Sequence, residues 1–205
     1  GAGPIPATVS GSGVVRFQPA LAKQSQRLVS TALSRLPRIQ GKPVIFHFLP
    51  ALTSCRGKLL SAQGRGTEIH AASFMRQRLT VLDRDLLAQP PELARILIHE
   101  LFHYSWIRLG NKARWSFEDL LRSEAASNAR GELGWSAWIL KRCLSARDVL
   151  ERTPAWRAYA CESYCDSAAC FYSGISSHPE FTLASRFRKI RVHWFSTQFS
   201  SVISI

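Results

Sequence analysis

The stretch that decides the fold is Pro90-Pro-Glu-Leu-Ala-Arg-Ile-Leu-Ile-His-Glu-Leu-Phe-His-Tyr-Ser-Trp-Ile-Arg-Leu-Gly110. The two leading prolines favour a helix start, because proline is tolerated in the first turn of a helix. Apolar residues from Leu93 to Leu109 then recur at helical spacing, and Gly110-Asn111 supplies a stop. We therefore predict one long apolar helix that carries the polar pattern His-Glu-Leu-Phe-His at residues 99–103.

On either side of this helix, the sequence predicts strands first and helices afterwards. The predicted elements are a helix over Pro19–Leu36, a strand over Pro43–Leu49, strands within Arg65–Leu82, and helices over Phe117–Arg130, Trp135–Cys143, Pro154–Phe171 and Pro179–Trp194. This order predicts an α+β fold, with a small N-terminal sheet followed by a mostly helical half. Ser196–Ile205 is compatible with either a strand or a frayed tail.

Composition sets the broad class of the protein. With 205 residues, of which 46% are hydrophobic and 20% charged, the chain has enough apolar surface for a folded core. Residues 1–13 are rich in Gly, Pro, Ala and Ser and are expected to form a flexible leader, with 14–205 as a single domain. The apolar runs are far shorter than the roughly 18 residues of a membrane-spanning helix.

The pattern within the central helix is His99-Glu100-Leu101-Phe102-His103. Residues four apart lie on the same face of a helix, so the two imidazoles can hold one cation with the Glu100 carboxylate beside it. Neutral imidazoles are common zinc ligands, and a catalytic zinc site needs a third protein ligand and one open position. The alternative is that both histidines are hydrogen-bonded helix residues without a metal.

These residues resemble the zincin metallopeptidases. In the metzincin branch, a Gly and then a third His follow the second His at intervals of three residues, but this chain has Trp106 and Leu109 at those places. The gluzincin branch takes its third ligand from Glu-x-x-x-Asp on a later helix, and Glu162-Ser-Tyr-Cys-Asp166 has that form. The resemblance covers these motif residues alone.

The resemblance implies zinc-dependent hydrolysis of peptide bonds. By it, His99, His103 and Glu162 are the Zn²⁺ ligands and Glu100 is the general base. Asp166 is the outer carboxylate that orients a ligating imidazole. The 58 residues between His103 and Glu162 match the long spacer of the neprilysin-like branch.

A second glutamate competes for the role of third ligand. Glu124, in Ser123-Glu124-Ala-Ala-Ser-Asn128, follows His103 at a spacing similar to that of thermolysin-like enzymes. Asn128 stands where those enzymes have an aspartate, and a neutral amide supports a ligating imidazole less well than a carboxylate does. Both alternatives stay open at this point.

The resemblance also implies how a peptide substrate binds. An extended peptide would pair with the edge of the sheet, on a strand from the Thr67–Leu82 region. Tyr172, His178 and His193 are downstream candidates for stabilising the oxyanion, and no motif chooses among them.

Cysteines and basic residues suggest further features. The five cysteines are an odd number with three of them, Cys161, Cys165 and Cys170, in one segment, which favours reduced thiols and a reducing compartment such as the cytoplasm. Their spacing matches no common cluster signature, so they are expected to be buried structural thiols, the alternative being a thiolate ligand in place of Glu162.

The net charge of +13 would attract an acidic partner or nucleic acid. Four cationic side chains flank an apolar seam on the last predicted helix, at Arg186, Arg188, Lys189 and Arg191. They are expected to be a solvated face or a docking face. The alternative functions are therefore a nucleic-acid-associated protein with a structural or regulatory zinc site, and an inactive zincin-fold interaction module.

Overall fold

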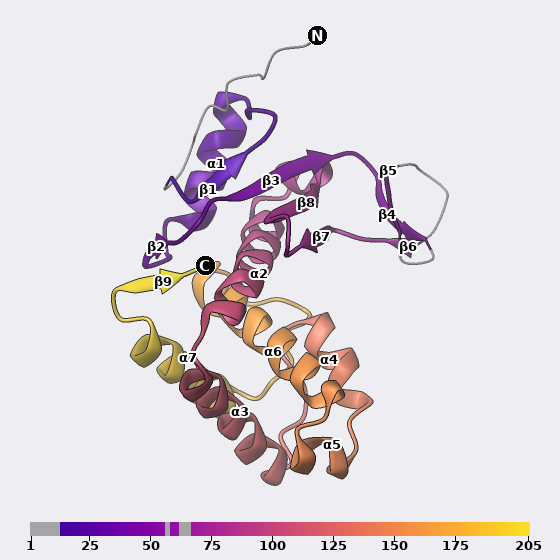
Figure 1. Ribbon diagram of the computed structural model, residues 1–205, viewed down its shortest axis with the longest axis vertical. Coiled ribbons are helices and arrows are strands. Elements are labelled where there is room, and N and C mark those ends of the chain that lie inside the picture. The colour runs from indigo at the N-terminus through magenta and orange to yellow at the C-terminus, as the bar shows by residue number, and fades with distance from the viewer. Residues whose placement is uncertain (1–12, 56–57, 62–66) are drawn as a thin grey trace.

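A computed structural model of the chain describes residues 13–55, 58–61 and 67–205 (Figure 1). The predicted leader, apart from Gly13, lies outside these ranges. The described chain has the predicted α+β fold, with a small N-terminal sheet followed by a mostly helical half.

The main sheet has four strands. In spatial order they are β1 (Val15–Phe17), β3 (Val44–Leu49), β8 (Leu79–Asp83) and β7 (Ala71–Phe74). The first three run parallel, whereas β7 pairs antiparallel with β8 and places Ser73 opposite Thr80. Alternate side chains of β1 and β3 are buried, as expected for a sheet with one face on the core. Three short strands form a separate antiparallel sheet, in the order β5 (Lys58–Ser61), β4 (Leu52–Cys55) and β6 (Thr67–Glu68).

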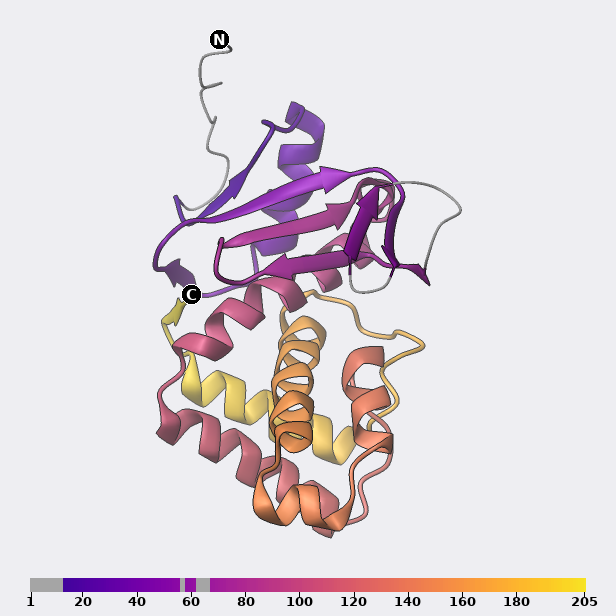
Figure 2. The same cartoon turned by 45° about the vertical axis from the view of Figure 1, so that its right-hand side comes forward.

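Seven α-helices and one short 3-10 helix lie within the described residues. They are α1 (Lys23–Leu33), the 3-10 helix η1 (Arg84–Ala88), α2 (Pro90–Arg108), α3 (Asn111–Ala126), α4 (Trp135–Arg142), α5 (Ala146–Glu151), α6 (Pro154–Tyr172) and α7 (Ser185–Gln198). Figures 1 and 2 show α2 between the sheet and the helices α3 to α7. None of the helices in the described residues could cross a membrane.

The central helix α2 has the predicted bounds to within two residues. Proline occupies its first turn together with Glu92, whose charge suits the positive end of the helix dipole. Leu97 and Phe102 are completely buried, because α2 packs against the sheet and α1 on one side and against α6 on the other. The core thus holds α2 in place between the sheet and α6.

The chain ends in a short strand, which settles the segment that the sequence left open. β9 (Val202–Ser204) pairs in parallel with β2 (Arg38–Gln40), and the Ile205 amide donates to the carbonyl of Gln40. Figure 1 shows this end of the chain beside the N-terminal half. One apolar core, from Val15 to Ile205, includes residues of both the sheet and the helices.

The bounds of three predicted helices are wrong. The first helix starts later, because the Gln18 amide still donates to Phe46 of the sheet. α3 starts at Asn111, within the predicted Gly110-Asn111 stop, and ends before Asn128, which has a left-handed φ of 52°. α7 begins at Ser185 because the Thr182 and Leu183 amides donate instead to the Glu132 carbonyl.

Candidate metal centre

The two histidines of α2 lie side by side. His99 Nε2 and His103 Nε2 are 3.2 Å apart, and the ring centroids are 4.9 Å apart at an interplanar angle of 76°. This arrangement follows from their spacing of four residues, which brings both side chains to one face of the helix.

Glu162 of α6 reaches the same point from across the helix interface. Its Oε2 is 3.3 Å from His99 Nε2, and its Oε1 is 3.8 Å from His103 Nε2. The side chain of Glu162 is 25% exposed and that of His103 is 18% exposed, whereas His99 is buried. Solvent therefore reaches the group from the side of Glu162.

Asp166, one turn further along α6, fixes the orientation of His99. Its Oδ1 is 2.8 Å from His99 Nδ1, and its Oδ2 accepts a hydrogen bond from the Ala137 amide at the start of α4. A carboxylate only accepts, so the proton is on His99 Nδ1 and the Nε2 lone pair faces Glu162 and His103. Asp166 thus contacts the His99 ring nitrogen that faces away from Glu162.

The contact between His99 Nε2 and Glu162 Oε2 favours a positive charge between the ring and the carboxylate. A lone pair on His99 Nε2 and an anionic Glu162 oxygen repel each other at 3.3 Å, and a second proton on His99 or a metal ion between them would relieve this repulsion. Burial opposes a charge on His99, but the Asp166 carboxylate outweighs burial and raises the pKa of the imidazole well above its usual value. Burial likewise opposes a charge on Glu162, and its hydrogen bond with His99 outweighs burial and lowers the pKa of the carboxyl.

The donor set fits a tetrahedral metal ion. With bonds of about 2.0–2.1 Å to nitrogen and oxygen, the ligand atoms of a tetrahedral zinc site are roughly 3.3–3.4 Å apart. The 3.2 Å between the two Nε2 atoms and the 3.3 Å from His99 Nε2 to Glu162 Oε2 are near this value, whereas His103 Nε2 is 3.8 Å from the other Glu162 oxygen, Oε1. Ligand atoms of His99, His103 and the neighbouring Glu100 also lie within 4.8 Å of one another, so these described residues form a grouping that could hold a metal ion.

Glu100 lies beside this group and is tied to the edge of the sheet. One of its oxygens lies within 4.8 Å of a ring nitrogen of each histidine, and Ser73 Oγ donates to its Oε2 at 2.6 Å. Ser73 and Thr80 are 2.7 Å apart, and Thr80 and Tyr104 are 3.1 Å apart. Each hydroxyl has one proton, so the chain runs from Tyr104 through Thr80 and Ser73 to Glu100, with every hydroxyl donating onward.

Glu124, the competing third ligand, is engaged elsewhere. It is buried, and both of its oxygens accept from Arg191 of α7, at 2.9 Å from Nε and 2.6 Å from Nη2. Arg191 also donates to Glu132, so it belongs to a buried ion network and not to the solvated basic face expected for the last helix. Asn128 lies beyond the end of α3, where its left-handed backbone suits asparagine.

The three downstream candidates for the oxyanion have other surroundings. Tyr172 is buried beside Phe102 and Phe171, and burial raises the pKa of its hydroxyl to about 12. His178 Nε2 is 2.7 Å from a Glu92 oxygen at the start of α2. His193 lines a groove between α3 and α7. No contact connects any of the three with Glu100 or Glu162 in the described residues.

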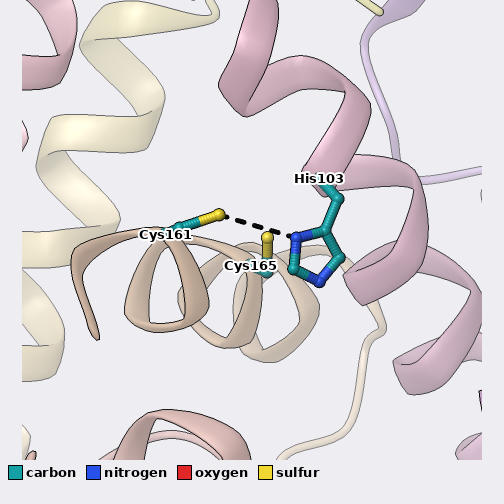
Figure 3. A group of neighbouring side chains, drawn as sticks. All are labelled: His103, Cys161 and Cys165. Carbon is teal, nitrogen blue, oxygen red and sulfur yellow. Dashed lines mark hydrogen bonds between the residues drawn. The ribbon is translucent and has the colours of Figure 1, made fainter. Parts of the chain in front are cut away.

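Two cysteines of α6 approach the opposite side of the His103 ring, and the sequence did not predict this contact. Figure 3 shows Cys161 and Cys165 on one helix and His103 on the other, with Cys161 Sγ 3.6 Å from His103 Nδ1. A hydrogen bond from Cys165 lowers the pKa of the Cys161 thiol to about 6, whereas burial raises the pKa of Cys165 well above its usual value. The spacing of four residues was the available signal, because it places both sulfurs on one helix face.

Comparison with known proteins gives no match: no family model, no curated protein and no solved structure is similar to this chain.

Proposed function

We propose that this protein is a zinc-dependent peptidase of the gluzincin type, with His99, His103 and Glu162 as ligands. The observation that carries the proposal is the convergence of both Nε2 atoms and the Glu162 carboxylate at separations of 3.2 to 3.8 Å. Glu162 comes from a helix far along the chain, so the spacing of the two histidines alone does not account for it. Nitrogen and carboxylate donors with one open side are the usual ligand set of a catalytic zinc.

A zinc ion bound there supplies a Lewis acid that lowers the pKa of water towards about 7 and polarises a peptide carbonyl. The chain's own contribution is the base. Glu100 takes a proton from the attacking water and later gives it to the leaving amine, so that one carboxyl serves as base and then as acid. Its hydrogen bond from Ser73 holds Oε2 at the sheet edge, and Oε1 would take the proton.

Strand β7 supports a peptide as the substrate. Within the described residues it is the outer strand of the main sheet, paired only with β8, and it contacts α2. An extended peptide can add to such an edge through backbone hydrogen bonds. Ser73 lies on this strand, so a peptide bound along β7 would pass beside Glu100.

The test uses zinc-loaded protein and a mixture of internally quenched peptides. We expect the wild type to cleave them and to stop when a chelator is added. Glu100→Gln should keep one equivalent of zinc and lose about 10²- to 10⁴-fold in turnover, because the proton transfer is removed. Glu151→Gln, which changes an exposed glutamate on α5, is the matched control and should behave as the wild type does.

Two results would contradict the proposal. The first is zinc bound at one equivalent to a wild type that cleaves no peptide in the mixture. The second is a Glu100→Gln variant with undiminished turnover, because it would remove Glu100 from the reaction.

A further inference from the structure

The sulfur atoms of Cys161 and Cys165 face a ring nitrogen that the proposed zinc site leaves unused. They lie one helical turn apart on α6, and the two sulfurs and a nitrogen of His103 all lie within 4.8 Å of one another (Figure 3). The nitrogen in contact with Cys161 is Nδ1, whereas Nε2 of the same ring faces His99 and Glu162.

We propose that Cys161 Sγ, Cys165 Sγ and His103 Nδ1 form a second metal site, for a soft, thiophilic cation such as Cd²⁺ or Zn²⁺. Thiolates select cations of this class, and two thiolates with one imidazole form a known kind of zinc ligand set. The site goes beyond the proposed peptidase activity and does not require that activity.

The geometry agrees with such a site. With metal–sulfur bonds of about 2.3 Å and metal–nitrogen bonds of about 2.0–2.1 Å, the sulfur and nitrogen atoms of a tetrahedral site are roughly 3.5 Å apart. The observed distance from Cys161 Sγ to His103 Nδ1 is 3.6 Å.

The burial of the two cysteines also agrees with the proposed metal site. Cys165 is completely buried and Cys161 is partly buried. Two thiolates and a neutral imidazole around a divalent cation have no net charge, which suits a site withdrawn from water.

The shared ring makes the two sites exclude each other. A neutral imidazole has one ring lone pair, so His103 binds a metal through Nδ1 or through Nε2. When a cation binds at the thiols, both sulfurs release their protons to solvent and the His103 proton stays on Nε2. There it donates to His99 Nε2, 3.2 Å away, while His99 Nδ1 donates to Asp166.

Binding of a metal at His103 Nε2, with the thiol site empty, is equally consistent with the contacts. A metal on Nε2 leaves the proton on Nδ1, where it donates to the sulfur of Cys161. A thiophilic cation is therefore expected to displace zinc from His99, His103 and Glu162 and to inhibit the proposed enzyme.

Cadmium titration of the reduced, metal-free full chain tests the site. Bonds between cadmium and thiolates give a near-ultraviolet charge-transfer band, which histidine and carboxylate ligands do not give. We expect this band to saturate at one equivalent in the wild type. It should be lost, or weakened at least tenfold in affinity, in Cys161→Ser and Cys165→Ala. It should be unchanged in Glu162→Gln.

Cys170→Ser and Cys143→Ser are the matched controls, because they remove a thiol outside the cluster and should keep the band. Circular dichroism identifies a variant that has not folded, and the partly buried Cys161 is the less disruptive of the two positions. The absence of a band in the folded wild type would overturn the proposal. So would a full band in folded Cys161→Ser and Cys165→Ala.

Release of zinc tests whether the two metal sites exclude each other. Zinc-loaded wild type should release its zinc at a cadmium concentration at least tenfold lower than Cys165→Ala does. A thiolate band that forms while all zinc is retained would overturn the sharing of His103.

These results separate the two proposals. A band in the wild type without peptide hydrolysis would reject the peptidase and keep the thiol site. Hydrolysis without a band would reject the thiol site alone.

Discussion

His99 is the residue on which the proposed metal centre depends. Its Nδ1 donates to Asp166 and its Nε2 is directed at Glu162 and His103, so both ring nitrogens have defined partners. A ring held in this way is prepared for a cation, because its lone pair already points at the binding position. The same contacts make protonated His99 the competitor of the metal, so metal binding should release protons.

Ser73 should matter for turnover and not for zinc. Its hydroxyl donates to Glu100 Oε2 at 2.6 Å and ties this carboxylate to the sheet edge. We expect Ser73→Ala to lower kcat by about tenfold, because a base that is free to change rotamer is in the productive position less often. Zinc affinity should stay unchanged, as measured by titration against a chelating dye.

Ser73→Thr keeps the hydroxyl and is the control for this substitution. Its kcat should be near that of the wild type. A Ser73→Ala enzyme with full kcat, or one that has lost its zinc, would show that Ser73 does not act through Glu100.

The sequence predicted some of these residues and could not predict others. His99, Glu100 and His103 were predicted from their spacing on one helix, and Glu162 and Asp166 from the resemblance to the gluzincin pattern. Glu124 fitted a similar pattern, and the structure pairs it with Arg191. The role of Ser73 depends on how a strand approaches a helix, which no local pattern contains.

At the scale of elements, the crossing of α2 and α6 builds the centre. Glu162 and Asp166 face His99, whereas Cys161 and Cys165 face His103. The two residues of each pair are four positions apart on α6, and one pair is offset from the other by one residue. The two helices therefore present matching sets of donors one helical turn apart.

Gly134, at the start of α4, is where a third element touches the centre. A Cβ at this position would lie 2.1 to 2.3 Å from the Asp166 carboxylate, so Asp166 or α4 has to move. We expect Gly134→Ala to weaken zinc binding about 10- to 100-fold, the usual effect of losing the outer partner of a ligating histidine. Zinc affinity measured against a chelator checks this.

Gly110→Ala is the matched control, because this glycine caps α3 and a Cβ there meets nothing within 4 Å. The control should keep the zinc affinity of the wild type. Equal affinities for the wild type and Gly134→Ala would mean that the position of Asp166 does not govern metal binding.

Element predictions were best where a local signal marks a boundary. Proline at Pro90 and Pro154 gave the starts of α2 and α6, and Gly134 preceded α4. The short parallel pair of β2 and β9 was not predicted. Each has three residues, and its partner lies at the other end of the chain, so no periodic pattern is visible within either segment.

At the scale of the whole molecule, a buried ion network joins the helices of the second half. Arg191 of α7 donates to Glu124 of α3 and to Glu132, and Lys141 of α4 and Tyr159 of α6 also donate to Glu132. Burial opposes the charge on Glu132, but the positive charge of Arg191 outweighs burial and lowers the pKa of the carboxyl to about 2. The network stabilises the fold only while Glu132 is ionised.

The direction of the pH dependence follows from that pKa. A carboxyl whose pKa is lowered from 4.5 to about 2 binds its proton more readily in the unfolded chain, and the shift corresponds to about 3 kcal/mol of stability. This contribution is fully present above about pH 5 and is lost as the pH falls towards 2. We therefore expect acid to lower the free energy of unfolding in urea over this interval.

Glu132→Gln separates this group from the other carboxyls. The variant should be less stable at pH 7, because it removes an anion beside buried Arg191, and it should lose less stability between pH 5 and 2. Parallel pH profiles for the two proteins would show that Glu132 does not contribute to acid unfolding.

The most direct test of the metal centre is anomalous diffraction from crystals grown with zinc, measured on both sides of the zinc absorption edge. The account predicts a peak of anomalous density at bonding distance, about 2.0–2.1 Å, from Nε2 of His99 and Nε2 of His103, with Glu162 as the third protein ligand. A map without density at this point, in crystals where His99 keeps a direct hydrogen bond to Glu162, would contradict it.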